Sequence, residues 1–273
     1  MMVRDNFKKL CEPIIKGWLN ELIKGTGISE ASKFNEKFSG TKYEMYPESL
    51  PMIFTGNLES DVVFIELNPG YGLLTPSVNN NELLMQNFKN QKTPVVKDFS
   101  SYVSFFSQFG TCKSLHLQRD GNKKLDTHGK RQIDFFFGLG LLDNYDYSFE
   151  NYEFIRNDKL QLEFIPYMSK SFSFSKFSNS EIEKRFDFIK EIVSLKERKY
   201  VIVTGNKKLL EQLFKSEKVK FEPHIIEGRK KADIYSEIII ENEVKYILAP
   251  SYKSQSLHSN QLRNYGQQIK EKL

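Results

Sequence analysis

The most informative stretch of the sequence is a short apolar run that ends in a turn, Val62-Val63-Phe64-Ile65-Glu66-Leu67-Asn68-Pro69-Gly70-Tyr71-Gly72. Short continuous runs of β-branched and aromatic residues are typical of parallel strands that are buried on both faces. Asn-Pro-Gly is common turn chemistry. The stretch therefore predicts a buried strand over 62–65, with a turn at its carboxyl end.

Other segments extend this pattern along the chain. Strands are expected over 160–165, where Pro166 ends the run, over 200–204 and over 246–248, with further strand material at Ile225 and 238–240 around a basic hairpin. A helix is expected over 13–24, with Pro13 in the first turn and Gly25 just past the end, and another over 81–90. Further helices are expected after a capping box at Ser180–Glu183, after Gly205-Asn206 through Phe214, and after Ser259 as a cap.

Strands that alternate with helices predict an α/β fold, with a central, mostly parallel sheet flanked by helices. We expect one domain over 1–273, with an N-terminal helical extension over 1–45 and an irregular insertion over 110–160. Within these, 33–56 is expected to be a loop and 114–132 an exposed basic excursion. Ligands bind beyond the carboxyl ends of such sheets, so the expected site comprises 68–72, 163–167 and 249–254.

Composition limits the function classes. The chain has 273 residues, of which 39% are hydrophobic and 27% charged, as in a globular protein. Because it has no apolar run long enough to cross a bilayer, no signal peptide and only Cys11 and Cys112, we expect a cytoplasmic protein without a structural disulfide. The net charge of +5 is spread over scattered Lys and Arg, which permits a nucleic-acid partner without requiring one. A monomer is expected.

Several enzyme classes lack support in the sequence. It contains no Walker-type glycine-rich loop and no G-x-S-x-G motif. The four histidines, at 116, 128, 224 and 258, are scattered and have no metal-binding spacing. We therefore expect neither a cofactor nor a zinc site.

Residues 63–70 resemble the first motif of the uracil-DNA glycosylase superfamily. The resemblance is to the N-P-G branches, the mismatch-specific and single-strand-selective monofunctional enzymes, rather than to the classical G-Q-D-P-Y-H pattern. The second family motif, a strand followed by H-P-S-P or N-P-S, is similar to Leu248-Ala249-Pro250-Ser251-Tyr252-Lys253-Ser254. Two positions depart from the family: Glu66 stands in place of a Gly, and Ala249 in place of a His or Asn.

This resemblance, which covers about 45–270, implies a uracil-DNA glycosylase-like fold and a monofunctional DNA glycosylase that acts on an extruded base. Asn68 falls where the family keeps the Asn that positions the water, although it could simply form an Asx turn before Pro69. Glu163 falls where a middle-strand Asn reads the pyrimidine edge, with an outward-facing strand residue as the alternative. Gly70 leaves room at C5 of the base, and the aromatic residues that could stack on the base are Tyr71, Phe88 and Phe99.

The second motif implies a DNA-binding surface. Pro250 and Ser251 would shape a turn that grips a phosphate, while Tyr252, Lys253 and Leu257 are candidates for the wedge that replaces the flipped base. Lys253 and Arg263 could contact phosphates, or could simply be solvated. Because Ala249 offers no side-chain hydrogen bond, catalysis would depend on backbone N–H groups around Ser251 or on His258, unless the protein binds DNA without cutting it.

The expected substrate is a pyrimidine with a C5 substituent, specifically a modified cytosine. A carboxylate at Glu163 accepts hydrogen bonds only, which suits the N4 amino group of cytosine better than O4 of uracil. Modified cytosine in phage DNA would extend this expectation to a role in host defence. The rival readings are a catalytically lapsed nucleic-acid binder of the same fold and a nucleotide-handling α/β hydrolase or transferase.

Overall fold

The computed structural model describes residues 2–67, 96–108, 127–148, 150–151, 155, 158–169, 173, 177–205, 213, 222–223, 235–241, 244–250 and 258–271. Every statement about the structure below concerns these residues. The predicted helix over 81–90, most of the one predicted to end at Phe214, and the predicted strand material at Ile225 lie outside them.

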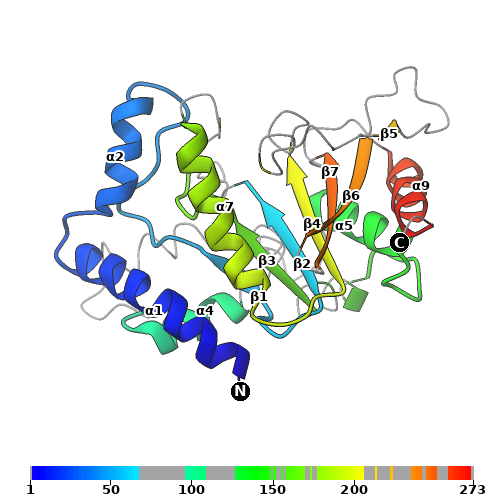
Figure 1. Ribbon diagram of the computed structural model, residues 1–273, viewed down its shortest axis with the longest axis horizontal. Coiled ribbons are helices and arrows are strands. Elements are labelled where there is room, and N and C mark those ends of the chain that lie inside the picture. Colours follow the sequence, from blue (N-terminus) through cyan, green and yellow to red (C-terminus); the bar gives the residue numbers. More distant parts are fainter. Residues whose placement is uncertain are drawn as a thin grey trace, which may run out of the picture.

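A seven-stranded sheet forms the centre of the described structure, in the order β1-β3-β2-β4-β7-β6-β5 (Figure 1). Strands β3, β2, β4 and β7 are parallel neighbours, whereas β1, β6 and β5 pair antiparallel with their neighbours. The strands are β1 (Phe54–Gly56), β2 (Val62–Glu66), β3 (Lys159–Glu163), β4 (Tyr200–Gly205), β5 (Glu222–Pro223), β6 (Tyr235–Glu241) and β7 (Val244–Pro250). The predicted α/β class and mostly parallel sheet are confirmed.

Helices cover both faces of this sheet. They are α1 (Met2–Ile23), α2 (Ser29–Phe38), α4 (Phe99–Gln108), α5 (Thr127–Gly138), α7 (Asn179–Val193) and α9 (Ser259–Lys270). One core joins buried residues of α1, α2, α4 and α7 to Val63 and Ile65 of β2. A second core joins α5 and α9 to Phe64 of the same strand. Successive residues of β2 thus face opposite helix layers, which explains the uninterrupted apolar run in its sequence.

The order of the four parallel strands shows where the chain stops adding strands on one side of β2 and begins adding them on the other side. From β2 the chain adds β3 on one side, and then returns to add β4 and β7 on the other side. The change falls between β2 and β4, whose carboxyl ends lie at the same edge. In open α/β sheets, this switch point is where the crevice for ligands forms.

The N-terminal third is more regular than predicted. Helix α1 begins at Met2, so Pro13 lies inside it and not in its first turn. The apolar residues that face the core recur at helical spacing from Val3 onward, which extends the helix backward. Residues within the predicted 33–56 loop form the end of α2 and the edge strand β1, and both helices of residues 1–45 contribute to the same core as the sheet.

The middle and C-terminal predictions differ from the structure in three places. The predicted irregular, exposed stretch contains α5, whose Gln132 is fully buried. The capping box of α7 joins Ser178 to Glu181, two residues earlier than predicted. Helix α9 begins at Ser259, one residue earlier than predicted, because His258 and not Ser259 is its N-cap residue.

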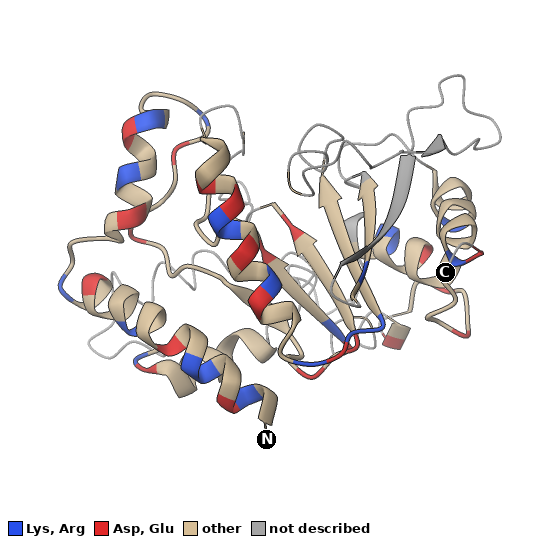
Figure 2. Cartoon of the chain, viewed as in Figure 1, with Lys and Arg blue, Asp and Glu red and all other residues tan. Residues whose placement is uncertain are grey.

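Charged residues of both signs are distributed over the described helices, without a single basic block (Figure 2). None of the described helices is both long enough and apolar enough to span a membrane. Cys11 is a free thiol buried in the first core.

Candidate functional site

Two carboxylates lie side by side at the carboxyl edge of the sheet. Glu163 is the last residue of β3 and the aligned partner of Glu66, the last residue of β2. Aligned residues of neighbouring parallel strands project from the same face. Both are buried, with 3% of Glu163 and 7% of Glu66 exposed. The predicted base-reading position is therefore adjacent to the residue that departs from the family's first motif.

Backbone hydrogen bonds keep this alignment beyond the strands. The N–H of Phe164 donates to the carbonyl of Glu66 at 2.8 Å, and the N–H of Ile165 donates to the carbonyl of Leu67 at 2.9 Å. Leu67 directly precedes Asn68 in the sequence. The residue that precedes the Asn-Pro-Gly motif is thus still hydrogen-bonded to the segment that follows Glu163.

A row of buried polar side chains leads along β3 to Glu163. Lys159 Nζ donates to Gln161 Oε1 at 3.0 Å, and Gln161 Nε2 donates to Glu163 Oε1 at 2.7 Å. Gln132 of α5 also contacts Lys159 Nζ, at 3.5 Å. The Lys159 ammonium lies 5.3 Å from the centre of the Phe64 ring. Lys159, Gln161 and Glu163 alternate along β3, so all three face the side of the sheet that α5 and α9 cover.

This row fixes the direction of its hydrogen bonds. An ammonium group can only donate, so the Gln161 atom that faces Lys159 must be the carbonyl oxygen. The amide nitrogen then points toward Glu163, whose Oε1 must accept. The row therefore holds Glu163 as a hydrogen-bond acceptor at the carboxyl edge.

The other side of the switch point is formed by β4 and β7. Thr204 is buried and its hydroxyl donates to the carbonyl of Ile65 at 3.3 Å. Its aligned partner on β7 is Ala249, which is fully buried in the core shared with α5 and α9. Ala249 thus supplies only a methyl group, packed among apolar side chains.

Few of the other predicted site residues belong to the part of the chain that the structure describes. Pro250 ends β7, where its backbone is aligned with Gly205 of β4. Phe99 is the first residue of α4 and is buried in the first core, where its ring centre lies 6.1 Å from that of Phe7. The other candidates lie outside the described residues and stay predictions: Asn68, Gly70, Tyr71, Phe88, Ser251, Tyr252, Lys253 and Leu257.

His258 and Arg263 lie at and within α9. His258 is the exposed N-cap residue of this helix. Arg263 Nη1 lies 3.3 Å from a carboxylate oxygen of Asp134, and its guanidinium stacks 4.1 Å from the centre of the Tyr145 ring. Asp134 is fully buried and also accepts a 2.9 Å hydrogen bond from the Tyr145 hydroxyl. Arg263 is thus tied into the α5–α9 layer, with 29% of its side chain exposed; its contact with phosphate stays a prediction.

The environment of Tyr145 keeps this hydroxyl protonated. Burial and the hydrogen bonds with Tyr147 and Asp134 all raise the pKa of Tyr145. A protonated hydroxyl remains a donor to Asp134 across the ordinary pH range. This contact connects the segment after α5 to α5 itself, and Arg263 of α9 contacts both of its members.

Sequence reasoning missed three members of the buried row: Lys159, Gln161 and Gln132. The signal was the strict alternation of polar and apolar residues in Lys159-Leu160-Gln161-Leu162-Glu163. That alternation usually marks a strand with one solvated face, but here α5 covers the polar face. No group of three or more His, Cys, Asp or Glu residues able to hold a metal ion occurs within the described ranges.

A scan against models of protein families finds no match to this chain, and a search of curated proteins finds no similar one.

Proposed function

We propose that this chain is a DNA glycosylase that hydrolyses the N-glycosidic bond of an extruded pyrimidine at the carboxyl edge of β2 and β3. The observation that carries the proposal is the alignment of Glu163 with Glu66, at the point where β2 leads toward Asn68. Three independent arguments agree on this edge: the resemblance of the sequence motifs, the switch point of the sheet, and the buried polar row that ends there.

The reaction needs a positioned water and a site for the departing base. The water oxygen forms a bond to C1′ while the C1′–N bond breaks. The electron pair of the C1′–N bond leaves with the base. The base then takes up the proton that the water loses. In this scheme Asn68 orients the water, as the family resemblance implies, and groups at the carboxyl edge bind the base as it leaves.

The polarity of Glu163 favours a particular substrate. Its carboxylate, held as an acceptor by Gln161, matches the N4 amino donor of cytosine and opposes O4 of uracil. Gly70 in the motif replaces the bulky residue that excludes C5 substituents in the classical uracil enzymes. We therefore propose a C5-substituted cytosine as the preferred base.

The test uses purified full-length protein and oligonucleotides that each contain one uracil, 5-hydroxymethyluracil, cytosine, 5-hydroxymethylcytosine or glucosylated 5-hydroxymethylcytosine. Release of the base leaves an abasic site, which alkali converts to a strand break. We expect more breaks at a modified cytosine than at uracil. Preferential release of uracil would overturn the substrate assignment while leaving the glycosylase proposal intact.

Two variants make this assay specific to Glu163. Glu163→Gln, which provides an amide donor as well as an acceptor, should reduce the preference for cytosine over uracil by about tenfold, because a well-placed pair to a base edge contributes about 1–3 kcal/mol of discrimination. Glu36→Gln removes an exposed carboxylate on α2 and should leave the preference unchanged.

A DNA-binding protein of the same fold that releases no base is the second candidate. The observation that favours it is Ala249, which is buried among apolar residues and supplies no polar group at the second motif. The same oligonucleotides distinguish the two functions. Binding to DNA in a mobility-shift assay, with no abasic product from any base, would favour the binding protein and contradict the glycosylase.

A further inference from the structure

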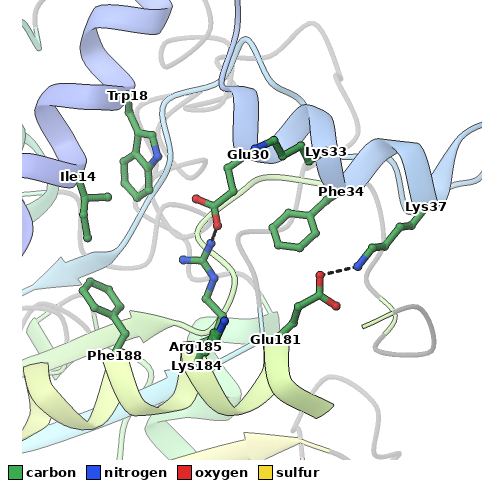
Figure 3. A pocket seen from close by; sticks show the side chains of 10 residues that line it. All are labelled: Ile14, Trp18, Glu30, Lys33, Phe34, Lys37, Glu181, Lys184, Arg185 and Phe188. Atoms are coloured by element: carbon green, nitrogen blue, oxygen red, sulfur yellow. Dashed lines mark hydrogen bonds and ion pairs between the residues drawn. The ribbon is translucent and has the colours of Figure 1, made fainter. Parts of the chain in front are cut away.

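A cavity of about 420 Å³ lies between α1, α2 and α7, on the opposite side of the sheet from Gln132 and the polar row (Figure 3). This volume lies within the range of small-molecule pockets, roughly 300–1,000 Å³. Neither the sequence motifs nor the proposed base-excision site includes it. Its lining combines aromatic walls with an excess of positive charge.

The walls are apolar and held in place by packing. Trp18 of α1 and Phe34 of α2 are only 5% and 7% exposed. Both pack against the ring of Tyr167, at 5.9 Å and 5.8 Å between ring centres. Phe188 of α7 and Ile14 of α1 complete the apolar lining. These side chains provide a preformed surface for a flat, apolar group.

Arg185 of α7 extends into this cavity toward Glu30, between Phe34 and Phe188 (Figure 3). Only 17% of its side chain is exposed, and burial lowers the pKa of Arg185 to about 10, so it stays charged at neutral pH. Its hydrogen bonds use one nitrogen, Nη2, which donates to Glu30 and lies 3.4 Å from the Tyr167 hydroxyl. Within the described residues, the remaining N–H groups of Arg185 have no hydrogen-bond partner.

The carboxylates that line the cavity are already engaged. Glu30 accepts from Arg185 and from the Tyr167 hydroxyl, and Glu181 pairs with Lys37. Lys33 and Lys184 also line the cavity but form no ion pair within the part of the chain that the structure describes. The lining therefore carries two more positive charges than negative ones, since four basic residues face two acidic ones.

We propose that this cavity binds a small aromatic anion, a planar ring system that carries one carboxylate, sulfonate or phosphate group. The ring lies against Trp18, Phe34 and Phe188, and the acidic group accepts hydrogen bonds from the unused donors of Arg185. Lys33 and Lys184 add attraction at the rim. This assignment rests on the cavity alone and is independent of the glycosylase proposal.

Trp18 provides a direct readout, because it is the single tryptophan of the chain and lines the cavity. The probe is anilinonaphthalene sulfonate, an aromatic anion, which is titrated into the full-length folded protein while Trp18 emission is recorded. We expect saturable quenching with energy transfer to the probe. N-phenylnaphthylamine, which has the same rings without the sulfonate, should bind about tenfold more weakly, because it lacks the charged hydrogen bond to Arg185.

Three variants locate the charge that is responsible. Arg185→Gln should weaken binding of the anionic probe about tenfold and leave binding of the neutral analogue unchanged. Lys184→Glu should weaken binding of the anionic probe severalfold. Because Lys184 is exposed, this variant should fold even if Arg185→Gln does not. Lys24→Gln, at an exposed position outside the cavity, should have no effect.

The proposal fails if Trp18 emission does not respond, or if the neutral analogue binds as tightly as the anion. It also fails if folded Lys184→Glu and Lys24→Gln proteins bind the probe equally well. Near-ultraviolet circular dichroism checks that each variant keeps its tertiary structure before titration.

Discussion

Glu66 and Glu163 are aligned partners at the carboxyl ends of two neighbouring parallel strands, and both are buried. Burial of carboxylates is unfavourable unless hydrogen bonds compensate for the lost hydration. For Glu163, Gln161 supplies one such bond and Lys159 orients Gln161 in turn. Apolar residues at these positions would stabilise the fold without this cost of burial, so we interpret the row of Lys159 and Gln161 as residues that position a functional carboxylate at Glu163.

Lys159→Met tests whether this row acts on Glu163 from a distance. Methionine resembles the apolar part of the lysine side chain but removes the donor, so the orientation of the Gln161 amide is no longer fixed by Lys159. We expect the unfolding free energy to fall by about 1–3 kcal/mol, because a buried acceptor loses its bond. We also expect a weaker preference for cytosine over uracil in the folded variant. Lys159 is only a structural residue if stability falls and the base preference does not change.

The contact between α5 and α9 gives a test of the fold itself. A Cβ atom at Gly266 would lie 2.7 Å from the carbonyl oxygen of Phe135, whereas one at Gly17 of α1 meets no atom within 4 Å. Gly266→Ala should therefore reduce the unfolding free energy by about 1–3 kcal/mol through overpacking. Gly17→Ala should raise it by about 0.5–1 kcal/mol, since Gly is unfavourable within helices. Equal effects in urea unfolding would contradict this helix packing.

The capping box of α7 predicts a pH dependence. Burial disfavours ionisation of Glu181, but hydrogen bonds from Lys37 and Ser178 outweigh it and lower the pKa from 4.5 to about 2. Because the folded state favours the ionised form, this stabilisation is complete above pH 4.5 and is lost as the pH falls toward 2.

Glu181→Gln keeps a capping-box residue at N3 but removes the charge that pairs with Lys37, so it should reduce the unfolding free energy by up to about 1 kcal/mol at neutral pH. The difference between wild type and variant should shrink as the pH falls from 4.5 toward 2. Urea unfolding at several pH values measures it. A difference that stays constant across this window would show that the charge of Glu181 does not stabilise α7.

The sheet was largely predictable because its central strands are buried on both faces. The runs at 62–65, 200–204 and 246–248 are apolar apart from Thr204, and each forms a parallel strand. Burial by two helix layers produces this pattern directly. The order of the strands and the change of direction between β2 and β4 depend on contacts between distant segments, so they were not apparent from local patterns.

The helices at the N-terminus and in the middle were harder to predict. Pro13 is a common first-turn residue, which suggested a late start for α1, yet the apolar residues from Val3 onward extend the helix. Helix α5 begins in a basic, polar stretch, and its buried Gln132 contacts Lys159 of a strand 27 residues away. The alternation in 159–163 indicates a strand with a polar face, but that α5 covers this face depends on a contact between distant segments, which no local pattern reveals.

The most direct test of the central claim compares base release and DNA binding in wild type and Asn68→Ala. Single-turnover assays use the oligonucleotide that the wild-type protein cleaves best, and binding is measured on the same DNA. If Asn68 orients the attacking water at the carboxyl edge, the variant should lose base release by about a hundredfold or more and keep its affinity for DNA, because that interaction acts in the transition state. Base release at the wild-type rate in folded Asn68→Ala would contradict a catalytic site at this edge of the sheet.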